Sequence, residues 1–126
     1  DLEITRGLQA IVATCCEKAP RATLVLTAIF PRNDAPGLVP GIERINQNLA
    51  RLADGKTIRF LSINDQLADK AGVLHDGLTG DKLHLSLKGY ELWAAALKPI
   101  LTELLGPPAA TDHAPPPTGD PSAKKK

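Results

Sequence analysis

Residues 81–93 of this 126-residue chain read Asp81-Lys82-Leu83-His84-Leu85-Ser86-Leu87-Lys88-Gly89-Tyr90-Glu91-Leu92-Trp93. Ser86 is a good N-cap, because its side-chain oxygen can accept hydrogen bonds from backbone N–H groups in the first turn of a helix. Apolar residues follow it at helical spacing and predict a helix over residues 86–105. Asp81 and His84 then lie on the loop just before this helix, and loops held by a rigid scaffold are where catalytic groups concentrate.

Asp81 and His84 have the spacing of a catalytic pair. In a turn, a carboxylate three residues before a histidine can accept the Nδ1 proton of the imidazole ring. That contact fixes the tautomer and leaves Nε2 free to take a proton from a nucleophile. We therefore predict that Asp81 orients the ring and that His84 is a general base.

The pattern Asp-x-x-His-x-Ser-x-x-Gly-Tyr over residues 81–90 resembles the last sequence block of the SGNH (GDSL-type) esterases and acylhydrolases. Two further segments are similar to the branch of platelet-activating-factor acetylhydrolases and related bacterial esterases. Residues 29–32 resemble a strand end and its loop, and residues 41–46 resemble the helix that follows. The resemblance extends over most of residues 1–105. It implies the C-terminal half of a flavodoxin-like, three-layer SGNH hydrolase fold, with parallel strands flanked by helices.

This resemblance also implies a function. Members of such a family hydrolyse esters through a Ser-His-Asp mechanism without a cofactor, and the branch implies a small ester with a short, acetyl-type acyl group. The nucleophilic serine and the oxyanion glycine and asparagine would come from a preceding half. The chain begins with Asp1 rather than methionine, so we expect polypeptide upstream of it. We expect the 126 residues alone to be inactive.

The serines of the chain are Ser62, Ser86 and Ser122. Ser86 is expected to cap a helix, and Ser122 lies in a proline-rich tail. Ser62 ends a predicted strand, where an α/β active site would be, but it lacks the Gly-Asp-Ser turn that lifts a nucleophile out of a sheet. The sequence therefore predicts a base and its orienting acid without a nucleophile.

Residues 31–34 invite comparison with the Gly-x-Asn-Asp block of the same family. Pro31 stands where that block has glycine, so a backbone amide cannot approach an oxyanion there. We interpret Asn33 and Asp34 as a turn instead. Arg32 is a candidate for a position near the substrate entrance.

Two other interpretations remain open. One is a zinc or manganese site built from imidazole and carboxylate ligands in one glycine-rich loop, namely His75, Asp76, Asp81 and His84. The other is a non-catalytic α/β interaction or structural module, in which Asp81 caps a turn and His84 is an ordinary polar residue. Without the flanking residues of the motif, a lone Asp-x-x-His would favour this second interpretation.

The rest of the chain predicts alternating helices and strands. Helices are expected over residues 1–18, 41–53 and 86–105, with buried strands at residues 23–30 and 58–63. This order favours an α/β fold with parallel strands, although two strands are too few for a complete doubly wound sheet. The residues expected to face inward are Ile4, Leu8, Ile11, Val12 and Cys15 in the first helix, and Leu87, Leu92, Trp93, Ala96, Leu97, Ile100, Leu101 and Leu104 in the last.

The strand at residues 23–30 is nearly continuous apolar sequence and should have neighbours on both edges. In the fold that the chain resembles, one neighbour lies in the preceding half. Residues 1–105 would then leave a backbone edge unpaired beside Val25, Leu26 and Ile29. Such edges recruit other strands, so we expect self-association or pairing with the missing N-terminal half.

Charge and composition exclude some partners. Residues 106–126 contain three lysines and two aspartates, which leaves 12 basic and 12 acidic side chains in residues 1–105. A neutral body with few aromatic rings does not indicate a nucleic-acid partner, and no apolar run is long enough to span a membrane. Residues 106–126 predict a disordered, proline-rich tail. Cys15 and Cys16 fit small, partly buried apolar positions.

Overall fold

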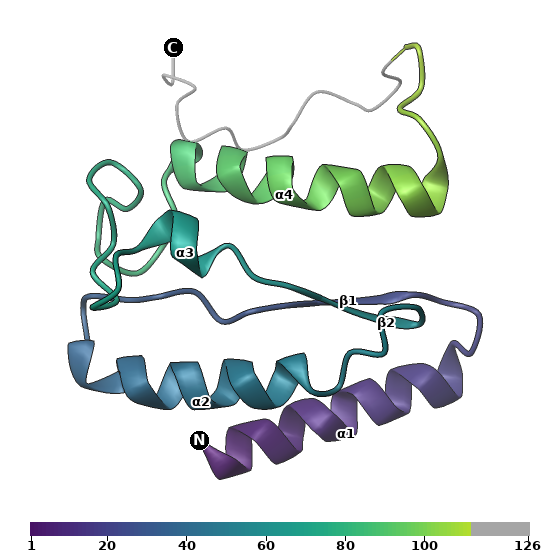
Figure 1. The fold of residues 1–126 in the computed structure, drawn as a ribbon, viewed down its shortest axis with the longest axis horizontal. Helices are drawn as coiled ribbons and strands as arrows, with labels where there is room; N and C mark the ends of the chain where they lie inside the picture. Colours follow the sequence, from purple (N-terminus) through teal and green to yellow (C-terminus); the bar gives the residue numbers. More distant parts are fainter. Residues whose placement is uncertain (112–126) are drawn as a thin grey trace, which may run out of the picture.

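The computed structural model describes residues 1–111, and Ser122 with most of the proline-rich tail lies outside them. The elements are α1 (Leu2–Lys18), β1 (Leu24–Thr27), the short 3-10 helix η1 (Pro36–Leu38), α2 (Val39–Ala50), β2 (Ile58–Leu61), α3 (Asn64–Leu67) and α4 (Leu87–Leu105). They form three layers, with α1 and α2 on one side of the strands and α3 and α4 on the other (Figure 1). The α/β class expected from the sequence is confirmed.

The two strands run parallel, with Leu24 opposite Ile58 and Thr27 opposite Leu61. Backbone hydrogen bonds extend the pairing at both ends, from the Leu24 N–H to the Thr57 carbonyl and from the Ala28 N–H to the Leu61 carbonyl, each at 2.8 Å. Both strands are shorter than the apolar runs that contain them. Because they run parallel, their carboxyl ends lie at the same edge of the sheet. The carboxyl ends of β1 and β2 therefore open onto the same loops.

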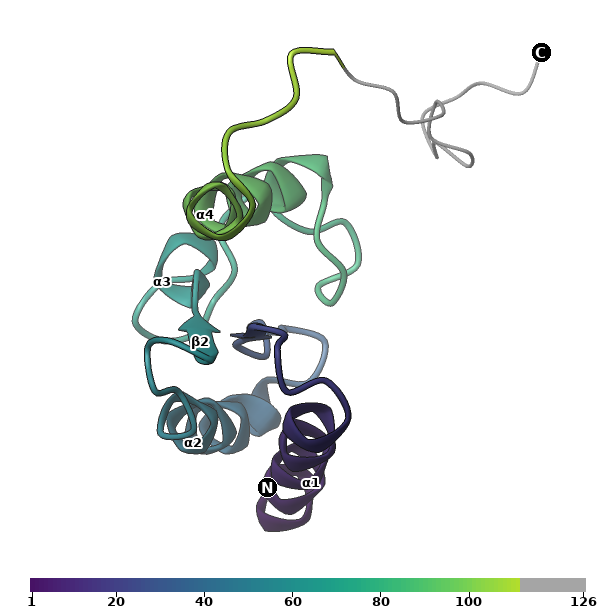
Figure 2. The same ribbon diagram turned by 90° about the vertical axis from the view of Figure 1, so that its right-hand side faces the viewer.

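Within residues 1–111 the sheet has only these two strands, so the outer edge of β1 has no partner. All four residues of β1 are half-buried, and the expectation of a strand buried on both faces is wrong for this part of the chain. Figure 2 shows β1 beside β2, and no third strand lies next to β1 on its other edge within residues 1–111. An unpaired strand edge keeps water in contact with residues that a third strand would cover.

The main core lies beneath the loops at the carboxyl ends of the strands. Its buried members are Ile63, Leu67, Ala68, Leu74 and Leu78, and the partly buried residues packed against them are Phe30, Leu61, Leu85, Leu92, Trp93 and Ala96. The Phe30 and Trp93 rings meet edge to face with centroids 5.5 Å apart. This core joins the end of β2 and the loop after β1 to the first turns of α4, and its members Leu78 and Leu85 flank the loop that carries Asp81 and His84.

Several apolar residues expected to face inward are exposed. Leu87, Leu101 and Leu104 of α4 are 77%, 41% and 37% exposed, and Ile4 and Ile11 of α1 are 52% and 59% exposed. The helical periodicity identified apolar stripes correctly, but a stripe is buried only where another element covers it. None of the helices in residues 1–111 is long and apolar enough to cross a bilayer.

Candidate active site

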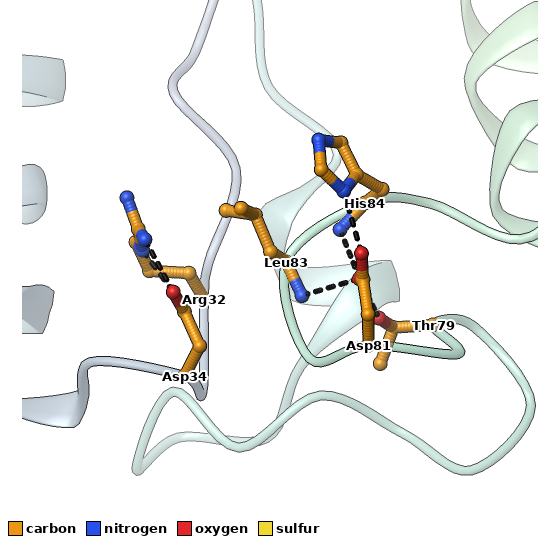
Figure 3. Close-up of polar contacts among 6 residues, drawn as sticks. All are labelled: Arg32, Asp34, Thr79, Asp81, Leu83 and His84. Atoms are coloured by element: carbon orange, nitrogen blue, oxygen red, sulfur yellow. Dashed lines mark hydrogen bonds and ion pairs between the residues drawn. The ribbon is translucent and has the colours of Figure 1, made fainter.

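Asp81 and His84 form a hydrogen-bonded pair in the loop before α4. The His84 Nδ1 atom lies 2.6 Å from Asp81 Oδ2. The other carboxylate oxygen, Oδ1, accepts hydrogen bonds from the backbone N–H groups of His84 (2.7 Å) and Leu83 (3.0 Å), and from the Thr79 hydroxyl (3.4 Å). Figure 3 shows the carboxylate between the turn and the ring, with the second ring nitrogen pointing away. One oxygen thus shapes the turn while the other orients the imidazole.

The Asp81 carboxylate is held in its ionised form. The hydrogen bond from the His84 ring is the largest cause, and the N–H groups of His84 and Leu83 add to it, so that the pKa of Asp81 lies well below its ordinary value. The His84 side chain is 74% exposed, and within residues 1–111 no hydrogen bond engages its Nε2. An ionised carboxylate on Nδ1 and an open Nε2 are what a general base requires.

The start of α4 fixes this loop at its far end. Ser86 is the N-cap, as predicted: its Oγ accepts a hydrogen bond from the Gly89 N–H at 3.3 Å and donates one to the Gly77 carbonyl at 2.6 Å. The Ser86 N–H also donates to the Leu78 carbonyl. A Cβ atom at Gly89 would lie 3.1 Å from that same Leu78 oxygen, so a larger residue there would require the loop to move by a few tenths of an ångström.

The loop after β1 lies next to this turn. Arg32 and Asp34 form a two-point ion pair, with Arg32 Nε 2.7 Å from Asp34 Oδ1 and Nη2 against Oδ2. The guanidinium lowers the pKa of Asp34, chiefly through these hydrogen bonds. In Figure 3, Leu83 lies between Arg32 and His84. Arg32 therefore lies on the loop beside the Asp81–His84 turn, and Asp34 balances its charge; a place near the substrate entrance stays a prediction.

Ser62, Ser86 and Asn33 lie in the elements where the sequence analysis placed them. Ser62 is exposed just after β2, and its Oγ accepts a weak hydrogen bond from the Asn64 N–H at 3.4 Å. Neither Ser62 nor Ser86 is hydrogen-bonded to His84. The side-chain amide of Asn33 donates a hydrogen bond to the Gly72 carbonyl and accepts one from the Leu74 N–H. Both bonds support a structural role for Asn33.

The described part of the chain contains no group of three or more His, Cys, Asp and Glu side chains arranged to hold a metal ion. The proposed ligands His75, Asp76, Asp81 and His84 all lie in that part, and Asp81 and His84 bind each other instead. Within residues 1–111 the structure therefore lends no support to the metal-site interpretation. Cys15 and Cys16 are both free thiols and partly buried.

The sequence reasoning missed two asparagines that hold the end of β1. Asn46 of α2 accepts from the Ile29 N–H at 2.7 Å and donates to the Ile29 carbonyl at 2.8 Å. Asn64 of α3 donates to the same carbonyl at 2.9 Å. No local sequence pattern predicts these hydrogen bonds, because they join residues that are 17 or 35 positions apart.

A sequence profile described as the GDSL-like Lipase/Acylhydrolase family matches residues 1–92. Among curated proteins, the chain is similar to "Platelet-activating factor acetylhydrolase IB subunit alpha1" of Pongo abelii, with 31% identity over 105 residues, and to the Homo sapiens protein of that name, with 30% identity. Each alignment covers 82% of this chain and 46% of the relative.

Among solved structures, the chain is similar to one from Streptococcus pneumonia described as a candidate platelet activating factor. The TM-score is 0.67 and the sequence identity 30%, and the match covers 79% of this chain and 50% of that one. The chain thus spans about half the length of the proteins it matches.

Proposed function

The chain belongs to the GDSL-like lipase/acylhydrolase family, and from this premise we propose that it carries the general base and the orienting acid of a serine ester hydrolase. The observation that carries the proposal is the 2.6 Å contact between His84 Nδ1 and Asp81 Oδ2, which leaves Nε2 exposed to an incoming hydroxyl. The motif that predicted this contact is also the one that resembles the family.

The mechanism proposed for the two residues is supported by that geometry. A serine hydroxyl gives its proton to His84 Nε2 as its oxygen attacks the ester carbonyl, forming a tetrahedral oxyanion. The imidazolium then donates the proton to the departing alcohol, leaving an acyl-serine. Water attacks the acyl group with His84 again as base, releasing the acid and the free serine. Asp81 stays ionised throughout and stabilises the imidazolium.

The serine and the oxyanion groups belong, in this proposal, to a polypeptide half upstream of Asp1. The 126 residues would contribute one half of an SGNH hydrolase domain, ending near residue 105. The substrate is a small ester, and a short acyl group is favoured by the relatives' name alone. Because neither Ser62 nor Ser86 is hydrogen-bonded to His84, the chain alone should not hydrolyse a p-nitrophenyl ester or react with a fluorophosphonate.

The test compares two histidines of one loop in a polypeptide that includes the upstream half. His84→Ala should lower kcat by about 10³-fold, because the nucleophile loses its base. His75→Ala, in the same exposed loop, is the matched control and should keep turnover close to the unmodified rate.

If His84→Ala leaves turnover within a few-fold, the pair is structural. The non-catalytic module would then be the better interpretation, since the unpaired edge of β1 is itself a surface for another chain.

A further inference from the structure

One carbonyl ties the loop after β1 to the turn of Asp81 and His84. Lys82 has a φ of 67°, and it is the one residue other than glycine with a positive φ within residues 1–111. Its carbonyl oxygen accepts hydrogen bonds from the backbone N–H groups of Asn33 at 2.8 Å and Asp34 at 3.3 Å. The left-handed region is disfavoured for a residue with a Cβ atom, so it persists where surrounding contacts hold it.

The Asn33 side chain fixes the position of those two donors. Its Nδ2 donates to the Gly72 carbonyl at 2.9 Å, and its Oδ1 accepts from the Leu74 N–H at 2.7 Å. Leu74 is only 8% exposed and belongs to the main core. Through Asn33, the loop after β1 is therefore anchored to a segment that cannot move without disturbing the core.

We propose that Asn33 is a positioning residue for the Asp81–His84 pair. Its side chain holds the loop after β1 on residues 72–74, and from there the N–H groups of residues 33 and 34 hold Lys82 in the conformation that turns Asp81 toward His84. The catalytic meaning of this inference rests on the proposed function, whereas its geometric content can be measured without any activity.

Asn46 supplies a matched control. It too is half-buried, and its side-chain amide likewise accepts one backbone hydrogen bond and donates another, at 2.7 and 2.8 Å. Both of its bonds go to Ile29, and neither Lys82 nor residues 72–74 are involved. Replacing Asn46 removes comparable contacts from the same end of β1 without touching the support of the turn.

The experiment is an NMR titration of the 126-residue chain with Asn33→Ala and Asn46→Ala variants. In Asn33→Ala, the pKa of the Asp81 carboxyl should rise by about one unit or more toward its ordinary value of about 3.9, because the turn no longer holds its hydrogen bonds. The signal of the hydrogen-bonded Nδ1 proton of His84 should weaken or vanish. In Asn46→Ala, both observables should stay as in the unmodified chain.

A rescue separates positioning from general support. Glycine adopts positive φ freely, so Lys82→Gly in the Asn33→Ala background should restore most of the low Asp81 pKa. The inference is overturned if Asn33→Ala leaves both observables unchanged, if Asn46→Ala changes them equally, or if Lys82→Gly rescues nothing.

Where an alanine variant does not fold, aspartate at the same position keeps the acceptor oxygen, and the same comparison applies. None of these outcomes depends on whether His84→Ala abolishes turnover, so the two proposals can fail separately.

Discussion

The turn around Asp81 and His84 is held by hydrogen bonds to nearby residues, whereas β1 has no strand partner along one edge within residues 1–111. In the turn, the Asp81 carboxylate satisfies two backbone N–H groups and Ser86 joins the loop to α4. The core beneath it contains side chains with no exposed area, Ile63 and Leu67. On the β1 side, the residues of the strand are half-buried and α1 exposes large apolar side chains. The hydrogen bonds of the Asp81–His84 turn can thus be complete while the sheet beside it, within residues 1–111, has only two strands.

The largest effect should appear in amide exchange along β1. The N–H groups of Leu24 and Ala28 donate to β2, so the alternation of a strand directs those of Val25 and Thr27 to the outer edge. In the dilute chain, Val25 and Thr27 should exchange faster than Leu24 and Ala28 by on the order of 100-fold, measured by hydrogen–deuterium exchange.

Sedimentation at rising concentration extends this test. If the edge recruits a second copy or an upstream half, Val25 and Thr27 should become protected as association proceeds. A stable monomer in which residues 23–30 are protected as strongly as α4 would show that the fold is self-sufficient, and the half-domain proposal would be wrong.

A pair of core and surface substitutions should show the next largest effect. Leu67→Ala removes a side chain with no exposed area, and we expect the free energy of unfolding to fall by about 2–5 kcal/mol. Ile11→Ala removes a side chain that is 59% exposed and should change it by less than about 0.5 kcal/mol. Denaturant unfolding measures both. A cost for Ile11→Ala as large as that for Leu67→Ala would mean that another chain covers α1 in solution.

The smallest effect should appear in how the free energy of unfolding changes at acidic pH. Because the folded-state pKa of Asp81 is below its ordinary value, its contribution to stability is present above about pH 3.9 and is lost as the pH falls toward the folded-state pKa. Asp81→Asn should therefore lose less stability between about pH 5 and pH 2 than the unmodified chain does. The effect should be small, because the pair is largely exposed.

Asp54→Asn, in the turn before β2, is the matched control for Asp81→Asn. Backbone N–H groups of Ile58 and Lys56 lower the pKa of its carboxyl, so Asp54→Asn should flatten the acid dependence in the same direction. Only Asp81→Asn should alter the NMR signals of the His84 ring. If neither variant changes the acid dependence of unfolding, these carboxylates do not contribute to acid stability.

Local patterns predicted the elements well. The helix after Ser86 begins at Leu87, and the apolar runs at residues 23–30 and 58–63 contain the two parallel strands. The family resemblance, built on the motif at residues 81–90, is confirmed by the profile match and the relatives. Predictions failed where burial depended on a neighbour, as at Ile4, Ile11 and Leu87. A periodic stripe shows which face is apolar but not which element will cover it.

The sequence by itself determined the helix cap at Ser86 and the contact of Asp81 with His84, because both join residues three positions apart and depend on local backbone geometry. Only the tertiary structure decided what supports that contact. The Asn33 N–H donates to the Lys82 carbonyl, and the Asn33 side-chain amide bonds to the backbone of Gly72 and Leu74. These partners lie between 39 and 49 positions from Asn33 in the sequence, and folding must first bring them together. Hydrogen bonds of that range depend on how the layers pack, and packing is a property of the whole chain rather than of any segment.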